Sequence, residues 1–244
     1  MTIALGRADL HMHTNASDGL PTAKEVLDFV ARRGHLDVIA ITDHDELDAS
    51  LWAYEQHNHY PFDIVPGVEV TSAHGHVLGL WVTRPIPMGL SLAETVAAIH
   101  EQGGVAILAH PFHLHACIGI GNVWRYLRWP EVLKQVKIDG IETHNAGVAT
   151  PGSNWMARRL GRRLGISVTG GSDAHALNSI GSGLTRFPGR TAHDLRLALE
   201  QGQTLAEGST WPLTDYWKLL PRLVIGTLSA SLATNPRSAH PTRP

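Results

Sequence analysis

The sequence is poor in cysteine, because Cys117 is the only one among 244 residues. A single cysteine excludes an intramolecular disulfide framework and any zinc site built on thiolates, and it suits a reducing compartment. We expect Cys117 to be a small buried hydrophobe.

Long apolar runs are also missing. The opening stretch, MTIALGRADLH, has too short an apolar segment for a signal peptide and leads straight into a strand-like segment, which predicts a cytoplasmic protein. Near the other end, LLPRLVIGTLSASLA contains Pro221 and Arg222 and is too short to span a bilayer comfortably. It predicts a packed C-terminal helix and no membrane partner.

The chain carries no strong charge of either sign. Its formal net charge is -2 and its pI is near 6.8, which gives no basic field for holding long nucleic acid. A mononucleotide or a short ligand stays open. A hydrophobic content of 43% and a charged content of 17% are those of an ordinary globular protein with a sizeable core.

Histidine, in contrast, is abundant, with 16 copies against 20 lysines and arginines. Most of these histidines stand near the ends of strand-like segments and not in a tag or tract. Neutral imidazole is the commonest metal ligand among side chains, so the excess indicates metal binding.

Apolar β-branched runs alternate with helical patterns along the chain, which predicts βα units around a parallel sheet. The expected strands are 8–11, 36–42, 63–71, 76–82, 105–109, 138–143 and 166–169. The expected helices are 22–33, 46–58, 91–102, 130–136, 153–164 and 191–201. About seven strands without a linker favour one closed or nearly closed α/β barrel over residues 1–210. A C-terminal helical extension (211–234) and a disordered tail (235–244) should follow.

In such a barrel, chemistry sits at the carboxyl ends of the strands. Each polar residue there has a plain structural explanation when taken alone, such as a satisfied histidine or a carboxylate in a salt bridge. Together, so many acids and imidazoles with almost no Lys or Arg beside them would repel one another or be buried at high cost without cations. The residues concerned are His11, His13, Asp18, Asp43, His44, Glu69, His76, His110, Glu142, His144, Asp173 and His175.

This pattern predicts two or three divalent metal ions. A donor set of imidazoles and carboxylates without thiolate suits zinc, manganese or iron(II). A carboxylated lysine is excluded as the bridging ligand, because every lysine lies in or beside a helical stretch, so Glu69 is the candidate bridge. Asp43, Glu142 and His144 are candidates for orienting the ligating imidazoles from behind.

The stretches DLHMHTNASDG, ITDHD, PGVEV, HVLGL, AHP and GSDAH occur in that order between residue 8 and about residue 185. In this combination the chain resembles the polymerase and histidinol phosphatase (PHP) family of metal-dependent phosphoesterases. The resemblance implies a distorted seven-stranded β/α barrel.

The resemblance also implies a ligand set. One metal would be held by His11, His13, Glu69 and Asp173, a second by Glu69, His76 and His110, and a third by Asp18, His44 and His175. His76 is preferred to His74 because it adjoins VLGL. The expected reaction is hydrolysis of a phosphate ester by a hydroxide that bridges the metals at Glu69, with His44, His175 or a water protonating the leaving oxygen.

The long loop after His110 carries the candidate substrate contacts. Arginine forks bind phosphate oxygens and aromatic rings stack bases, although the same aromatics could simply pack a lid. The candidates are Arg125, Arg128, Trp124, Tyr126 and Trp129, together with Arg186 and either His113 or His115.

The resemblance implies a nucleotide or a short oligonucleotide as the substrate, because compact members of the family that lack a polymerase often act on these. The alternatives are a histidinol-phosphate-type phosphatase, a protein-tyrosine phosphatase of the same fold, and a metal-stabilised regulatory barrel without turnover. Oligomeric state is left open by the sequence.

Overall fold

The computed structural model describes residues 5–113 and 120–216. Its strands are β1 (Leu5–Asp9), β2 (Val38–Ile39), β3 (Asp63–Ile64), β4 (Gly67–Ser72), β5 (Gly75–Leu80), β6 (Val105–Leu108), β7 (Gly140–Asn145), β8 (Ser167–Gly171), β9 (Gly183–Pro188) and β10 (Leu205–Gly208). Its α-helices are α1 (Ala23–Arg33), α2 (Asp48–Glu55), α3 (Leu92–His100), α4 (Ile120–Arg128), α5 (Val132–Gln135), α6 (Ser153–Leu164) and α7 (Ala192–Glu200). Two 3-10 turns are η1 (His57–His59) and η2 (Leu177–Ser179).

The strands form two mixed sheets, in the orders β10-β9-β1-β2-β3 and β4-β5-β6-β7-β8. A single bridge between Met12 and Ala174, just beyond β1 and β8, joins the two sheets. A second joins His44, which follows β2, to Glu69 within β4. Side chains from both sheets share one buried cluster that includes Leu10, Val38, Leu78, Ile107 and Phe187. The sheets therefore face each other across a common core, without continuous strand pairing around it in the described residues.

The expected all-parallel sheet is wrong at four junctions, because β1 and β10 each pair with β9, and β5 pairs with β4 and β6, in antiparallel fashion. At the β4–β5 junction the reason is chain length. Only Ala73 and His74 separate β4 from β5, with Gly75 at φ 119°, and so short a connection makes a hairpin and not a parallel crossover. The expected strand 63–71 is also divided, into β3 and β4.

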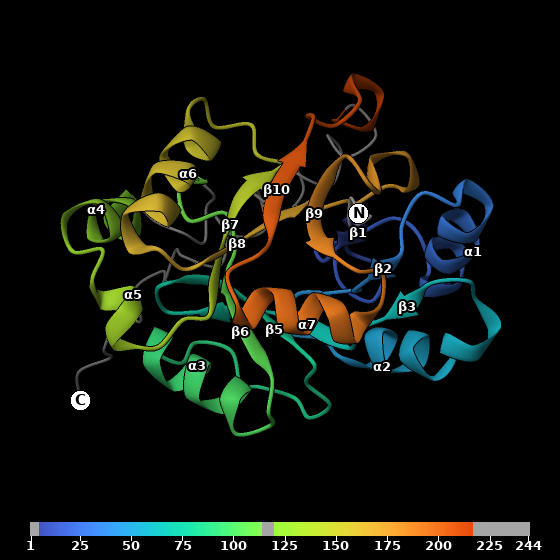
Figure 1. Ribbon diagram of the computed structural model, residues 1–244, viewed down its shortest axis with the longest axis horizontal. Helices are drawn as coiled ribbons and strands as arrows, with labels where there is room; N and C mark the ends of the chain where they lie inside the picture. The colour runs from blue at the N-terminus through green and yellow to red at the C-terminus, as the bar shows by residue number, and fades with distance from the viewer. Residues whose placement is uncertain (1–4, 114–119, 217–244) are drawn as a thin grey trace, which may run out of the picture. The chain divides into compact units, whose positions relative to one another are not determined.

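The helices begin where the sequence signals them. Thr22 and Ser91 each accept a hydrogen bond from the backbone of a glutamate three residues on, and that glutamate bonds back to the cap residue. Thr191 with Asp194 forms a third cap of the same kind. Helices α1 and α2 lie beside β2 and β3, whereas α4, α5 and α6 lie beyond β7 and β8 (Figure 1).

Part of the long loop expected after His110 is helical, because residues 120–128 form α4. Among the described residues, no helix is long and apolar enough to cross a membrane. The chain divides into one compact unit of Met1–Trp211 and a second that begins at Pro212, in which residues 213–216 are helical. The predictions for Cys117, for His115, for the rest of the 211–234 extension and for the 235–244 tail lie outside the described residues.

Candidate metal centre

Glu69 on β4 is fully buried and is surrounded by imidazoles. Its Oε2 lies 3.0 Å from His11 Nε2, 3.3 Å from His13 Nε2 and 3.3 Å from His44 Nδ1. Its Oε1 lies 3.0 Å from both His76 Nδ1 and His110 Nε2. One carboxylate thus contacts five histidines from four separate segments of the chain.

Three groups of donor atoms in the described residues have the compactness of a metal site. Their atoms all lie within 4.8 Å of one another inside each group. The groups are His11, His13, Glu69 and Asp173; His44, Glu69 and His76; and His13, Asp18, His44 and His175. All nine residues predicted as ligands therefore meet in one place, with His110 joined to the groups through Glu69.

The local backbone explains this convergence. His11 and His13 follow β1 with alternate orientation, so both imidazoles point into the site while Met12 between them packs in the core beneath α1. His110 and Asp173 take positive φ angles of 22° and 51°, which turn the chain sharply at the ends of β6 and β8. The hydrogen bond from His110 N–H to Glu142 holds the first of these turns.

Electrostatics couples these groups strongly. Burial would raise the pKa of the Glu69 carboxyl, but the imidazoles of His11, His44 and His76 hold it well below its usual range. Burial likewise opposes the charged form of His13, yet its hydrogen bonds to Asp173 and Glu69 raise its pKa to about 10. The pKa of His44 moves in the opposite direction, because burial lowers it to about 4. In the protein without metal, protons on His11 and His13 balance the buried carboxylates.

The donor geometry suits a metal ion once the imidazoles are neutral. His11 Nδ1 is 3.0 Å from Glu142 Oε1, so in the neutral ring a proton on Nδ1 donates there and leaves the Nε2 lone pair aimed at Glu69, which is also an acceptor. His175 repeats this pattern, with Nδ1 2.8 Å from the Asp173 carbonyl and Nε2 3.1 Å from Asp18 Oδ1. A cation between each pair of acceptors satisfies both.

Glu142 lies behind the cluster, as the sequence predicts for a residue that orients a ligating imidazole. Besides His11, it accepts hydrogen bonds from the backbone of His110 and from Asn145 Nδ2, at 3.0 and 2.9 Å. The sequence reasoning missed Asn145, which also donates to Asp173 Oδ2 at 3.1 Å. Its position directly after the IETH segment was the available signal.

Asp43 and His144, which the sequence predicts to orient imidazoles, have other hydrogen-bond partners in the described part of the chain. Asp43 accepts hydrogen bonds from the Thr14 backbone, the Thr14 hydroxyl and the Ser17 hydroxyl at 2.5–2.7 Å, so it shapes the loop that carries Asp18 and orients no imidazole. His144 Nε2 lies 3.2 Å from the Ser209 carbonyl, and none of the three donor groups includes His144. A register shift in β7 between Glu142 and His144 breaks the alternation that would have placed both on one face.

Two further predictions from the sequence concern neighbours of these ligands. His76 and not His74 faces Glu69, while His74 Nδ1 accepts a hydrogen bond from the Leu92 backbone. Trp211, assigned from the sequence to the C-terminal extension, packs beside His175 with ring centroids 5.7 Å apart. Its indole N–H donates to the Ser172 carbonyl at 2.6 Å, so it braces the segment that carries Asp173 and His175.

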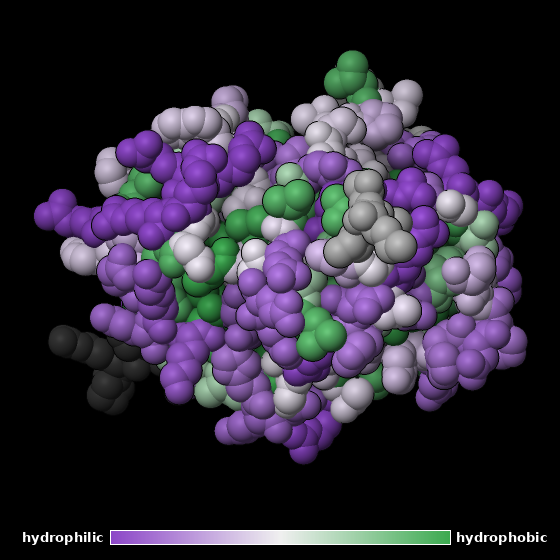
Figure 2. All heavy atoms as spheres, in the orientation of Figure 1, coloured by the Kyte–Doolittle hydropathy of each residue, from purple (hydrophilic) through white to green (hydrophobic). Residues whose placement is uncertain are grey.

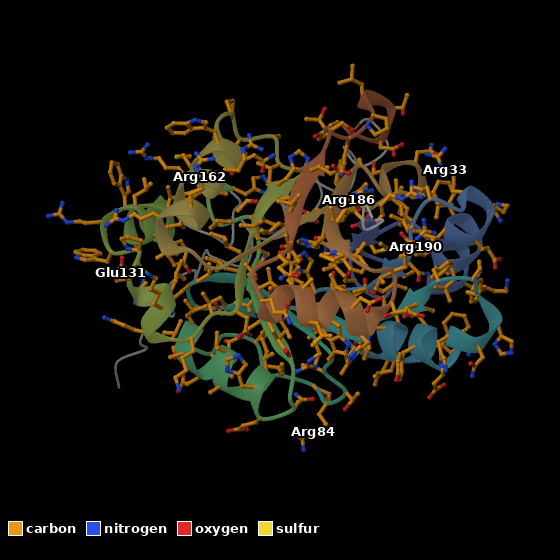
Figure 3. The ribbon with its side chains drawn as sticks, in the orientation of Figure 1. Arg33, Arg84, Glu131, Arg162, Arg186 and Arg190 are labelled. Atoms are coloured by element: carbon orange, nitrogen blue, oxygen red, sulfur yellow. The ribbon has the colours of Figure 1, made fainter. Side chains whose placement is uncertain are left out.

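The candidate substrate contacts separate into two kinds. Arg125 Nε is buried without a hydrogen-bond partner. Burial lowers the pKa of His74, and the Arg125 guanidinium lowers it further, so Arg125 lies near the β4–β5 turn that contains His74. Arg128 stacks over Trp129 at 5.5 Å. Arg186 lies over β9 and β10 (Figure 3) and pairs with Glu207 at 3.5 Å, so it is already neutralised.

The aromatic side chains of α4, and Trp129 just after it, are of two kinds, exposed and buried. Trp124 and Trp129 are 63% and 61% exposed, whereas Tyr126 is buried and donates its hydroxyl to the His74 carbonyl. Tyr126 is therefore a packing residue and not a stacking platform. His113 contacts the His110 ring edge-on at a centroid distance of 5.6 Å.

An α/β fold that gathers three carboxylates and six imidazoles at its strand ends belongs to the metal-dependent hydrolases. The profile of the PHP-associated family (PHP_C) matches residues 151–204. An uncharacterized protein of Methanocaldococcus jannaschii is 30% identical over 151 residues, which are 57% of this chain and 82% of the relative. The chain belongs to the PHP family of metal-dependent phosphoesterases.

Two other proteins extend the comparison. Phosphoribosyl 1,2-cyclic phosphate 1,2-diphosphodiesterase of Eggerthella lenta is 34% identical over 85 residues, which are 32% of this chain and 32% of that protein. A two-domain protein of Bacteroides vulgatus that contains a predicted PHP-like metal-dependent phosphoesterase has a similar structure, with a TM-score of 0.68 and 22% identity over 85% of this chain and 66% of that chain. The likeness to the Bacteroides vulgatus structure supports the α/β fold described above.

Proposed function

We propose that this protein hydrolyses phosphate esters of nucleotides or short oligonucleotides with two or three divalent metal ions. The observation that carries the proposal is Glu69, a buried carboxylate in contact with five imidazoles. Such a centre is costly without cations, and imidazole and carboxylate donors fit manganese, zinc or iron(II). We further propose that residues 1–210 are the catalytic domain, in a distorted form of the seven-stranded barrel, and that it works in the cytoplasm.

In this proposal the ligands are shared among three sites. His11, His13, Glu69 and Asp173 hold the first ion, Glu69, His76 and His110 hold the second, and Asp18, His44 and His175 hold the third. His44 lies in two of the donor groups, as does His13, so neighbouring sites share more ligands than the family pattern implies. Bound metal would lower the pKa of a water for attack on phosphorus and neutralise the phosphate oxygens.

The other residues orient and deliver protons. Glu142 holds the His11 ring through Nδ1, which keeps its Nε2 directed at Glu69. His44 and His175 have side chains 27% and 16% exposed, so they are the imidazoles of the cluster that a leaving oxygen reaches from solvent. A nitrogen that holds the third ion carries no proton, so we propose one of them as the proton donor where the third site holds no ion, and a water where it does.

Two observations support a nucleotide-type substrate. The Eggerthella lenta relative is named for a cyclic phosphodiester of a ribose phosphate. Arg125 has a buried Nε without a hydrogen-bond partner and lies near His74 in the β4–β5 turn, two residues before His76. Arg128 and Trp129 follow Arg125 on the same segment. We propose Arg125 and Arg128 as phosphate contacts and Trp124 or Trp129 as a stacking face.

The test compares the protein with Glu69→Gln and His110→Ala. Each is loaded with manganese and assayed on a generic aryl phosphate, histidinol phosphate, adenosine 3',5'-bisphosphate and short RNA, with metal content measured on the same preparations. We expect hydrolysis of the nucleotide substrates, and a loss of at least about 100-fold in kcat for both variants.

His144→Ala is the matched control, because His144 lies outside the donor groups. Full activity in Glu69→Gln would refute the mechanism. Preference for histidinol phosphate would replace the nucleotide by a small-molecule phosphomonoester, and metal binding without turnover on any ester would favour a regulatory barrel.

A further inference from the structure

Positive charge is concentrated in one segment of this weakly acidic chain. Between Glu142 and Asp173 there is no Asp or Glu, yet Arg158, Arg159, Arg162 and Arg163 all lie there. The net charge of -2 conceals this separation. A local field, and not the overall charge, decides whether a polyanion is attracted to a surface.

All four arginines are on the exposed side of α6. Their spacing of one, three and one residues places them on one helical face over two successive turns. The opposite face carries Ala157, Leu160 and Leu164, which are buried in the core. Arg162 is among the side chains that project from α6 (Figure 3), and hydrophilic side chains gather over this part of the surface (Figure 2).

These arginines have no carboxylate partner among the described residues. The exposed Arg190 and the half-buried Arg196, in contrast, pair with Asp37 and Glu200. An arginine face that the protein leaves without counter-charge is complementary to a row of phosphates. Trp155, 58% exposed and one turn before Arg158 and Arg159, adds a ring on which a base can stack.

A membrane fits this surface less well than a nucleic acid. A helix that lies on a bilayer inserts its apolar face, but the apolar face of α6 is already buried in the protein core. Only Trp155 remains as a large exposed apolar side chain on α6. The free face is basic, so a flexible polyanion is the occupant it suits.

The arginine-bearing helix α6 begins next to the metal centre and extends from it. Asn154 in the first turn of α6 exchanges two hydrogen bonds with the backbone of Asn145, whose side chain bonds Glu142 and Asp173. The helix therefore starts beside the cluster. From Trp155 to Arg163 it runs about 12 Å at 1.5 Å per residue, a length that a few nucleotides span.

We propose that the arginine face of α6 (Trp155, Arg158, Arg159, Arg162 and Arg163) binds the single strand of an oligonucleotide whose scissile phosphate ester occupies the metal centre. The inference rests on the proposed function, which it extends by assigning a path to the strand beyond the cleaved ester. Chain length should then affect substrate binding through α6 and leave the chemical step unchanged.

The test compares Arg158→Gln/Arg162→Gln with Arg32→Gln/Arg84→Gln, which removes the same charge from exposed arginines on other elements. Gln keeps helix propensity near that of Arg, so both variants should fold, as thermal melts would verify. Binding is measured as the fluorescence anisotropy of a labelled phosphorothioate decanucleotide at several salt concentrations. Turnover is measured on an aryl phosphate, a dinucleotide and a decanucleotide.

We expect the α6 variant to bind the decanucleotide at least about fivefold more weakly, and its log–log salt slope to fall by about 1.4, or 0.7 for each lost phosphate contact. Its KM should rise for the decanucleotide only, with kcat unchanged. The proposal would be overturned if the two double variants bound the decanucleotide equally well. It would also be overturned if the α6 variant bound phosphatidylserine vesicles more weakly than the unchanged protein but bound the decanucleotide as tightly.

The binding arm separates this proposal from the function it extends. Decanucleotide binding that depends on α6, in a protein that cleaves no ester, would support the arginine face and refute the proposed function. Ester cleavage in which KM does not depend on substrate length, and in which the α6 variant binds the decanucleotide unchanged, would support the proposed function and refute the arginine face.

Discussion

Asn145 contacts two carboxylates of the cluster at once, donating one hydrogen bond to Glu142 and another to Asp173. Asn145→Ala removes both from a buried site and lets the two carboxylates reorient. Loss of such an outer contact typically costs 10–100-fold in metal affinity or activity. We expect a loss of about that size, measured as the manganese concentration that gives half-maximal activity.

The preceding residue provides the control for this change. His144 faces the Ser209 carbonyl, so His144→Ala should leave the metal requirement within about twofold of the original. A similar loss in both variants would mean that the strand, and not the Asn145 amide, governs the cluster.

Protonation of His13 makes metal binding depend on pH. Hydrogen bonds to Asp173 and Glu69 outweigh burial and raise its pKa to about 10, so without metal His13 holds a proton throughout the neutral range. That proton must leave when the imidazole binds a metal. Below the raised pKa, each proton released makes binding about tenfold tighter for each rise of one pH unit.

We therefore expect the dissociation constant for zinc or manganese to fall at least about tenfold between pH 6.5 and 7.5. Competition with a chelator of known affinity at each pH measures this change, and calorimetry in two buffers counts the protons. A pH-independent constant would show that His13 is neutral before metal binds.

Among the elements, α1 shows how much a local signal contributes. Thr22 caps it through a reciprocal pair with Glu25, and both side chains lie on the surface away from the metal ligands. Thr22→Ala should lower the free energy of unfolding by about 1 kcal/mol and leave activity unchanged. Denaturant titration measures the loss, Thr22→Ser should restore most of it, and an unchanged midpoint in Thr22→Ala would contradict the cap.

Other elements depended on contacts that no local pattern encodes. β10 has four largely exposed residues, so its apolar pattern is too weak to read. β2 and β3 lie inside the expected strands 36–42 and 63–71, but each is only two residues long, a limit that the apolar run does not encode. β9 alternates buried and half-buried positions but ends in Pro188, which obscures the strand signal. Helices α1, α3, α6 and α7 were predictable because each has a long apolar stripe and a clear end.

For the whole molecule, the metal centre links the two sheets. His11 and His13 follow β1 of one sheet, whereas Glu69, His76 and Asp173 come from the other sheet or the turn after it. Ions held by both groups bind the folded state alone and so stabilise it. At a free metal concentration 100 times the dissociation constant, one ion adds about 2.7 kcal/mol.

Removal of the metal should therefore lower Tm by roughly 5–10 °C in a chain of this size. Thermal melts of the loaded and chelated protein measure the difference, and added metal should reverse it. Glu69→Gln is the control, because the loss of the shared ligand should make its Tm insensitive to the chelator. An equal response in Glu69→Gln would place the stabilising ion elsewhere.

The sequence by itself determined the α/β class, most helices and the identity of the clustered residues. Helical stripes and strand alternation are local properties. Nine acids and imidazoles near strand ends, with almost no Lys or Arg beside them in the sequence, are costly to bury unless they share cations, so they were expected to gather in one site. Membership of the PHP family followed from the same motifs.

Only the tertiary structure decided how those residues divide the work. The register shift in β7 replaced His144 by Asn145, the short hairpin turned β5 antiparallel, and Trp211 came to lie against His175. The unpaired arginine face of α6 also became visible only once the positions of the carboxylates were known. Each of these depends on which distant segments touch, and contacts between distant segments are set by packing and not by local pattern.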